Sequence, residues 1–182
     1  DAVVKPLIRL TRKNRENQYL VYSNISTMIS NRKKSFKPYL KHFFIFQSDP
    51  SFIKELKLDI LSSLASESSI SDILKEFKTY VKYPDKKFVS DSIKAICRVA
   101  TNVPDISELC LNILLKLITS DSEDVVAQSV IAIRHLVQQN PKQHKKVIKV
   151  MGTLVQAVQL PSAKASLIWM VGEYISIIPK IG

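Results

Sequence analysis

The stretch Asp49-Pro-Ser-Phe-Ile53 returns 36 residues later as Asp85-Lys-Lys-Phe-Val89, and a further shift of 37 residues carries its Phe-Val pair onto Val125-Val126. Each copy continues with apolar residues at helical spacing, and a second helical segment lies between successive copies. A period of roughly 35–39 residues with two helices per unit is typical of HEAT- or armadillo-like repeats, whose stacked units form an α-solenoid. The sequence therefore predicts an all-α fold, an α-solenoid of helical repeats.

We predict that residues 1–182 form a single fragment of a solenoid, made of successive repeat units. Because the chain opens on Asp1 inside an apolar run, we expect it to be a piece of a longer protein. Helix starts are predicted where a capping residue or a proline precedes an apolar stripe. These starts are Asp49-Pro50, Ser69 with Asp72, Asp85, Pro104, Asp121 or Ser122, Asn140-Pro141 and Pro161. The predicted units are roughly 1–48, 49–84, 85–120, 121–160 and a partial 161–182.

Composition excludes several other classes of protein. Only 3 of the 182 residues are glycine, which disfavours a doubly wound nucleotide-binding fold and an all-β fold. The sequence shows no apolar run long enough to span a membrane and no signal peptide. The two cysteines, Cys97 and Cys110, have apolar neighbours and are interpreted as buried thiols in a reducing compartment. We therefore expect a cytoplasmic protein.

Three local features lead to further expectations. The aromatic run at 41–48 predicts a buried extended segment, although the tail of a short helix from Phe36 is the alternative. Trp169, the only tryptophan, is interpreted as a packing anchor. Gly172 lies inside a predicted helix, where glycine is unfavourable, so it indicates a close approach of another helix.

The residue types that catalysis needs are scattered along the chain. The three histidines do not cluster with cysteines at metal-ligand spacing, and no phosphate-binding glycine loop or nucleophile elbow occurs. Asp121, Glu123 and Asp124 lie together at a predicted helix start, where acidic residues stabilise the helix dipole. We predict a protein that is not an enzyme and uses no cofactor or metal.

Basic charge is concentrated in residues 1–48, which hold ten Lys/Arg and two acids of a chain whose net charge is +11. Two basic clusters are expected at turns on one edge of the solenoid, where they would contact an anionic membrane surface or an acidic partner. A smaller cluster, at Lys142, Lys145, Lys146 and Lys149, equally fits a solvated helix face. Nucleic acid is disfavoured because no aromatic residues alternate with the basic ones. The predicted contact residues are Arg12, Lys13, Arg15, Arg32, Lys33 and Lys34.

The segment Ile168-Trp-Met-Val-Gly-Glu-Tyr174, preceded by Pro161-Ser-Ala-Lys-Ala-Ser166, resembles the trunk of the beta-adaptins, large subunits of clathrin-adaptor-type complexes. The resemblance extends over essentially the whole chain. Two further stretches are more similar to the beta subunit of adaptor protein complex 3 than to the other beta-adaptins. These are Asn31-Arg-Lys through Phe36-Lys-Pro-Tyr-Leu40 and Lys75-Glu-Phe-Lys-Thr-Tyr-Val81.

This resemblance implies a non-enzymatic scaffold segment of a vesicle coat, with a second large subunit, a medium subunit and a small subunit as partners. It implies peripheral association with Golgi and endosomal membranes and coated vesicles, and cargo sorting toward lysosome-related organelles. An Arf-type GTPase would bind parts of the trunk outside this chain. The alternative is a general basic helical-repeat module that acts in nuclear transport or binds nucleic acid.

Overall fold

The computed structural model describes residues 3–11, 15–139, 145–156 and 158–174. All regular structure in these ranges is helical, so the prediction of an all-α chain is confirmed. The chain forms two compact units, Asp1–Ala95 and Ile96–Gly182, which are described separately. Helix α5 (Lys86–Asn102) begins in the first unit and ends in the second.

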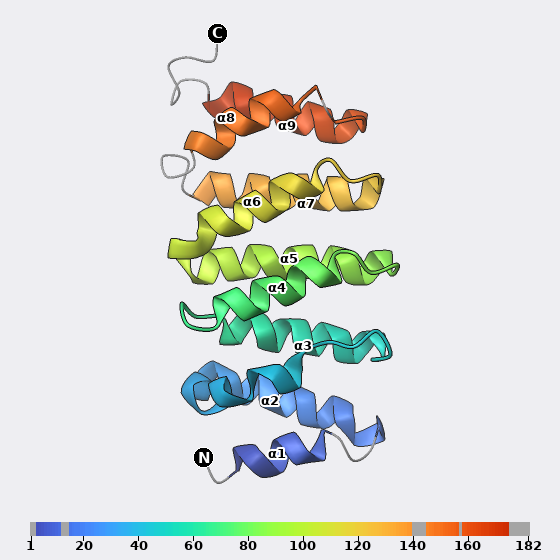
Figure 1. The fold of residues 1–182 in the computed structure, drawn as a ribbon, viewed down its shortest axis with the longest axis vertical. Helices are drawn as coiled ribbons and strands as arrows, with labels where there is room; N and C mark the ends of the chain where they lie inside the picture. The colour runs from blue at the N-terminus through green and yellow to red at the C-terminus, as the bar shows by residue number, and fades with distance from the viewer. Residues whose placement is uncertain (1–2, 12–14, 140–144, 157, 175–182) are drawn as a thin grey trace. The chain divides into compact units, whose positions relative to one another are not determined.

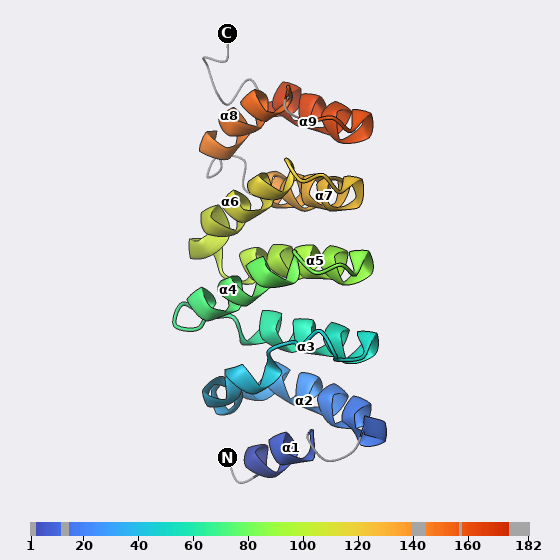
Figure 2. The ribbon, with the colours of Figure 1, turned by 45° about the vertical axis from the view of Figure 1, so that its right-hand side comes forward.

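In the first unit, the long helix α2 (Arg15–Phe36) lies between α1 (Val4–Leu10) and α3 (Ser51–Leu64), as Figures 1 and 2 both show. The 3-10 helix η1 (Lys37–Phe43) continues directly from α2 and packs on α3. Helix α4 (Ile70–Tyr80) completes the unit. Its apolar side chains repeat at helical spacing and are buried, including Ile73, Leu74 and Phe77.

In the second unit, α6 (Ser107–Leu117) packs against α7 (Glu123–Gln139), and α8 (Lys145–Leu154) packs against α9 (Pro161–Tyr174). A short 3-10 turn, η2 (Pro104–Ile106), precedes α6. The two pairs form successive layers, because α7 contacts α9 and α6 contacts α8. The core between them is aliphatic. It includes Leu111, Leu114, Val130, Ile133, Leu136, Val137, Ile148 and Leu167.

Side chains about one period apart in the sequence meet in space. In the first unit the Lys54 ammonium lies 5.2 Å from the centre of the Phe88 ring, 34 residues further along the chain. In the second unit Thr101 donates a hydrogen bond to Gln139, 38 residues further along. Such contacts are expected when each helix pair packs on the next. The exact repeat boundaries remain a prediction.

One of the predicted helix caps is wrong, and a second lacks its capping hydrogen bond. Asp49 does not cap α3, whose N-cap is Pro50; its carboxylate instead accepts the Phe46 N–H at 2.9 Å. Ser69 is the N-cap of α4 but makes no capping bond, because its hydroxyl donates to the Leu64 carbonyl at 3.1 Å. The Asp85 cap is confirmed by a 3.1 Å hydrogen bond from the Phe88 N–H. Helix α9 begins at Pro161 as predicted, and Asn140-Pro141 lies outside the described residues.

The aromatic run was expected to be buried and extended, and this is only partly correct. Lys37–Phe43 form a 3-10 helix, and only the residues after it have extended backbone or no regular structure. Phe43 and Ile45 are buried, but Phe46 is 63% exposed. The two expectations for α9 are wrong: Trp169 is 46% exposed. A Cβ added at Gly172 would meet nothing within 4 Å, so no described helix approaches closely there.

Candidate functional site

Of the six predicted contact residues, those that the structure describes lie at opposite ends of one helix. Arg12 and Lys13 lie outside the described residues, and Arg15 is the first residue of α2. The Arg32-Lys33-Lys34 cluster lies near the other end of the same helix, about 25 Å away at roughly 1.5 Å per residue. The prediction placed it at a turn between helices, and the structure has a kink there: two helical segments of α2 meet at Arg32, which has non-helical angles (φ −133°, ψ 44°).

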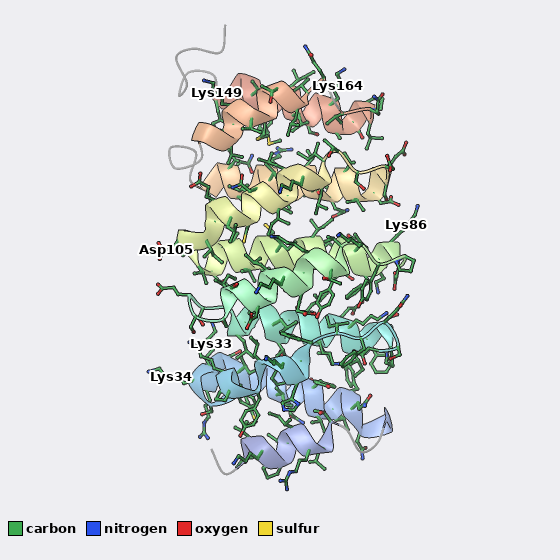
Figure 3. The ribbon with its side chains drawn as sticks, in the orientation of Figure 1. Lys33, Lys34, Lys86, Asp105, Lys149 and Lys164 are labelled. Atoms are coloured by element: carbon green, nitrogen blue, oxygen red, sulfur yellow. The ribbon has the colours of Figure 1, made fainter. Side chains whose placement is uncertain are left out.

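Lys33 has a structural role. Its ammonium donates to the backbone carbonyl of Ala65, the C-cap of α3, at 3.4 Å. A cation at this position offsets the partial negative charge of the helix C-terminus and binds one of its unpaired carbonyls. Arg32 and Lys34 are exposed and make no ion pair within the part of the chain that the structure describes. Figure 3 shows Lys34 pointing away from the helices.

The structure adds two lysines that the prediction omitted. Lys37 and Lys41 belong to η1, which continues directly from the kinked end of α2. Residues 32–41 therefore place Arg32, Lys33, Lys34, Lys37 and Lys41 close together in the sequence without any acidic residue. We call this stretch the 32–41 basic segment. The high density of lysine between residues 32 and 41 could have identified this segment from the sequence. Lys37 and Lys41 were omitted because the prediction included only basic residues expected in turns.

Two other lysines are buried and cannot contribute to a basic surface. The Lys57 ammonium pairs with the Asp49 carboxylate at 2.6 Å, with only 4% and 18% of the two side chains exposed. It also donates to the Phe44 carbonyl at 3.2 Å and lies 5.5 Å from the centre of the Tyr22 ring. Lys54 is buried against Phe88. Counting every lysine as exposed therefore overstates the positive surface of this unit.

The loop 44–49 is fixed by these contacts. Tyr80 accepts the Ile45 N–H at 2.8 Å, while Lys57 binds the loop from the side of α3. Burial raises the pKa of the Tyr80 phenol well above its usual range, although the hydrogen bond from Ile45 opposes this shift. The phenol therefore remains a neutral structural group. We call the contacts of Lys57, Asp49 and Tyr80 with this loop the loop clamp.

Both cysteines are free thiols, and neither is activated. The Cys97 Sγ lies 3.7 Å from His135 Nδ1, but burial raises the pKa of the Cys97 thiol. Burial also raises the pKa of Cys110 to about 12, so neither thiol is a ready nucleophile. Among the described residues, no group of three or more His, Cys, Asp or Glu side chains could hold a metal ion.

Of the smaller basic cluster, Lys142 lies outside the described residues and Lys149 is exposed on α8. No helix in the described ranges is long and apolar enough to cross a membrane. The candidate site is thus a surface, and its best-defined part is the 32–41 basic segment.

Comparison with known proteins identifies the family. The family described as "Adaptin N terminal region" matches residues 1–181. The chain belongs to the adaptin family. The adaptin chain is 47% identical to the human AP-3 complex subunit beta-1 over 179 residues, covering 98% of the chain and 16% of that protein. It is 38% identical to the AP-3 complex subunit beta of Dictyostelium discoideum, covering 98% of the chain and 19% of the relative.

A beta subunit of another adaptor complex is also similar. The AP-1 complex subunit beta of Dictyostelium discoideum is 34% identical over 93% of the adaptin chain and 18% of its own length. A homology model of the full-length AP-3 complex, in an intermediate open conformation, matches with a TM-score of 0.79. It has 29% sequence identity and covers 98% of the chain and 30% of the matched one. The α-solenoid prediction is therefore confirmed, as is the resemblance to beta-adaptins. The chain spans less than a fifth of the length of these curated relatives.

Proposed function

We propose that this chain is a scaffold segment in the large beta subunit of an AP-3-type adaptor complex, and that it acts by holding other subunits rather than by catalysis. The observation that carries the proposal is the 47% identity to AP-3 complex subunit beta-1, which extends over nearly the whole chain. Layers of paired helices suit this role, since each pair supports its neighbours and exposes a long side surface. The alternative, a module for nuclear transport or nucleic acid, has no comparable support.

The proposed partners are a second large subunit, a medium subunit and a small subunit, with an Arf-type GTPase bound by other parts of the same protein. The proposed location is the cytoplasmic face of Golgi and endosomal membranes and coated vesicles, where the complex sorts cargo toward lysosome-related organelles. Peripheral binding is consistent with a net charge of +11, since the cytoplasmic leaflet is anionic.

Co-purification of the full-length protein tests the scaffold role. We expect the tagged protein to recover a medium and a small subunit from cells in equal amounts. Leu61→Asp places a carboxylate in the core of α3 and should abolish this recovery, whereas Lys78→Asp, at an exposed site on α4, should preserve it. Wild-type protein that recovers no adaptor subunit would refute the proposal.

We further propose that the 32–41 basic segment contacts an anionic membrane surface. Arg32 and Lys34 are the free cations of the kink, and Lys37 and Lys41 extend the positive charge along η1. Arg15 begins α2 at the end opposite this segment, so it is not included in the proposed contact.

Flotation of the full-length protein with phosphatidylcholine vesicles, with and without phosphatidylserine, tests this contact. Each basic residue near such a surface contributes about 1 kcal/mol, so the double variant Arg32→Gln/Lys34→Gln should bind roughly 30-fold more weakly. The matched control, Lys78→Gln/Lys82→Gln, removes the same charge from exposed positions of the first unit. Equal losses in the two variants would show that only net charge matters.

A further inference from the structure

The turn that joins α3 to α4 is rich in serine and lies beside the 32–41 basic segment. Within Ser66–Ser69, the Ser66 hydroxyl lies 3.0 Å from the Ser69 hydroxyl and 3.3 Å from the Ser68 hydroxyl. Ser66 and Ser69 are half-buried and hold the turn together, because Ser69 donates to the Leu64 carbonyl. Ser68 is exposed, and its hydroxyl makes a weak contact with that of Ser66. Its hydroxyl can therefore be modified without breaking the turn.

Lys33 connects this turn to the basic segment. Its ammonium binds the Ala65 carbonyl, and Ala65 immediately precedes the turn. Figure 3 shows Lys33 next to the connection between α3 and α4. The donor-to-acceptor distance of 3.4 Å exceeds the usual range for an N–H···O bond, so this contact is weak. A stronger acceptor close to the turn would compete for the Lys33 ammonium.

We propose that Ser68 is a phosphorylation site, and that its phosphate pairs with Lys33 and weakens the binding of the basic segment to anionic surfaces. A protein kinase would supply the chemistry with a nucleoside triphosphate. The Ser68 oxygen forms a bond to the γ-phosphorus, the bond from that phosphorus to the bridging oxygen breaks, and the nucleoside diphosphate leaves. The hydroxyl proton passes to the base of the kinase.

Electrostatics favours this outcome. A phosphoserine carries about −1.5 to −2 charges at neutral pH, against five cationic residues at 32–41. The end of α3 and the start of α4 both border the turn, and their partial charges have opposite sign, so the helix dipoles largely cancel there. The adjacent carboxylate of Glu67 opposes a second negative charge, whereas the Lys33 ammonium at Ala65 favours one. Salt screens charges beyond about 8 Å, which confines the effect to this end of α2.

This inference rests on the proposed membrane contact, and the experiment separates the two. Full-length protein would be produced with phosphoserine at position 68 by genetic encoding, and its binding measured on vesicles with and without phosphatidylserine. We expect phosphoserine at 68 to weaken binding about tenfold or more. The matched control carries phosphoserine at Ser51, an exposed residue at the opposite end of α3, and should bind within about twofold of wild type. Equal weakening by the two phosphates would overturn the proposal that phosphorylation of Ser68 acts specifically on the 32–41 basic segment.

A second measurement tests the pairing without any membrane. A broad-specificity phosphatase should release phosphate from position 68 several times faster in Lys33→Met than in protein that retains Lys33. Equal rates would overturn the pairing, whatever the vesicles show. If unmodified protein does not bind anionic vesicles but the two rates of phosphate release still differ, the membrane contact is refuted and the pairing of the phosphate with Lys33 is supported.

Mass spectrometry of protein isolated from cells tests whether Ser68 is phosphorylated there. Trypsin releases Leu58–Lys75 as one peptide that contains the whole turn. Fragment ions of this peptide, from full-length protein isolated with phosphatase inhibitors, should place a phosphate on Ser68. A peptide recovered only in its unmodified form would overturn the assignment.

Discussion

The two compact units of the chain differ in how their helices are held together. In the first, aromatic rings and buried charges make directional contacts: Tyr80 lies within 6.0 Å of the ring centres of Phe77, Tyr83 and Phe88, and Lys57 pairs with Asp49. In the second, the described core is chiefly aliphatic, and its most prominent aromatic contact is the exposed stacking of Arg134 on Trp169 at 4.5 Å.

The two units also differ in net charge. Residues 1–95 contain 18 basic and 10 acidic side chains, a net charge of +8, whereas residues 96–182 contain 9 and 6, a net charge of +3. The comparison teaches that helix pairs can be held mainly by apolar burial, which needs no particular direction, with few directional contacts such as the hydrogen bond from Thr101 to Gln139. Directional contacts are added where a loop such as 44–49 must be held in one conformation. The predictions below test this difference.

The largest effect is expected at the loop clamp. Lys57→Met keeps the apolar stem but leaves the Asp49 carboxylate and the Phe44 carbonyl without their buried partner. Loss of one member of a buried ion pair costs about 3 kcal/mol, and urea denaturation should show this loss of stability. The control is Lys87→Met, which removes an exposed ion pair of the same 2.6 Å length with Glu55 and should cause no measurable change. Similar losses in the two variants would contradict a special role for the clamp.

Tyr80→Phe breaks the same clamp from the side of α4 and also tests the raised pKa. The variant leaves the Ile45 N–H unpaired, which should cost about 1–2 kcal/mol at neutral pH. In the wild type, the folded phenol keeps its proton while the unfolded phenol ionises near its ordinary pKa of 10.0. Stability from this group is therefore present below pH 10 and is lost as pH rises above it.

The advantage of wild type over Tyr80→Phe should consequently shrink by about 1.4 kcal/mol per pH unit above pH 10. Denaturation curves for both proteins across this range would measure it. A difference that stays constant with pH would mean that the phenol ionises equally in both states.

In the second unit, a gain is expected at Ser129. Its hydroxyl is buried in α7 and, among the described residues, has no hydrogen-bond partner. Because an unpaired buried hydroxyl is unfavourable, Ser129→Ala should stabilise the protein by about 1 kcal/mol. Ser92→Ala is the control from the first unit, since Ser92 donates to the Phe88 carbonyl at 2.8 Å and its loss should bring no gain. Thermal unfolding of both variants should give opposite or clearly unequal shifts.

The smallest effect is expected at Gly172. A Cβ at this position of α9 meets nothing within 4 Å, so Gly172→Ala should gain about 0.5–1 kcal/mol from helix propensity alone. Gly152→Ala in α8 has equal space and serves as a second test. If Gly172→Ala instead weakens the full-length protein while stabilising this chain, a helix outside the chain packs against that position.

Much of the fold follows from the sequence, because the repeat depends on apolar spacing. Phe88-Val89 and Val125-Val126 are buried where the period places them, and so is Ile53, but Phe52 is 47% exposed. The Asp85 cap follows from local chemistry. Asp49 does not cap α3, because its carboxylate pairs with Lys57. Ser69 is the N-cap of α4, but its hydroxyl donates to the Leu64 carbonyl and makes no capping bond. Local sequence contains no record of such partners.

The candidate site was less predictable for the same reason. Lys33 and Lys57 look like any other lysine in the sequence, yet one binds a helix terminus and the other is buried. Trp169 is the opposite case, because a large apolar residue on a helical stripe is usually buried. Here the ring lies at the surface, where the Arg134 guanidinium stacks on it. Sequence spacing locates a side chain on a helix but does not show what covers it.

The positions of the aromatic residues allow the unfolding of the two units to be followed separately by spectroscopy. Its single tryptophan lies in the second unit, whereas five of its six tyrosines lie in the first. Selective excitation of indole would follow melting of the C-terminal half, and phenol absorbance would follow melting of the N-terminal half. One unlabelled sample could therefore reveal whether the halves melt together or in sequence.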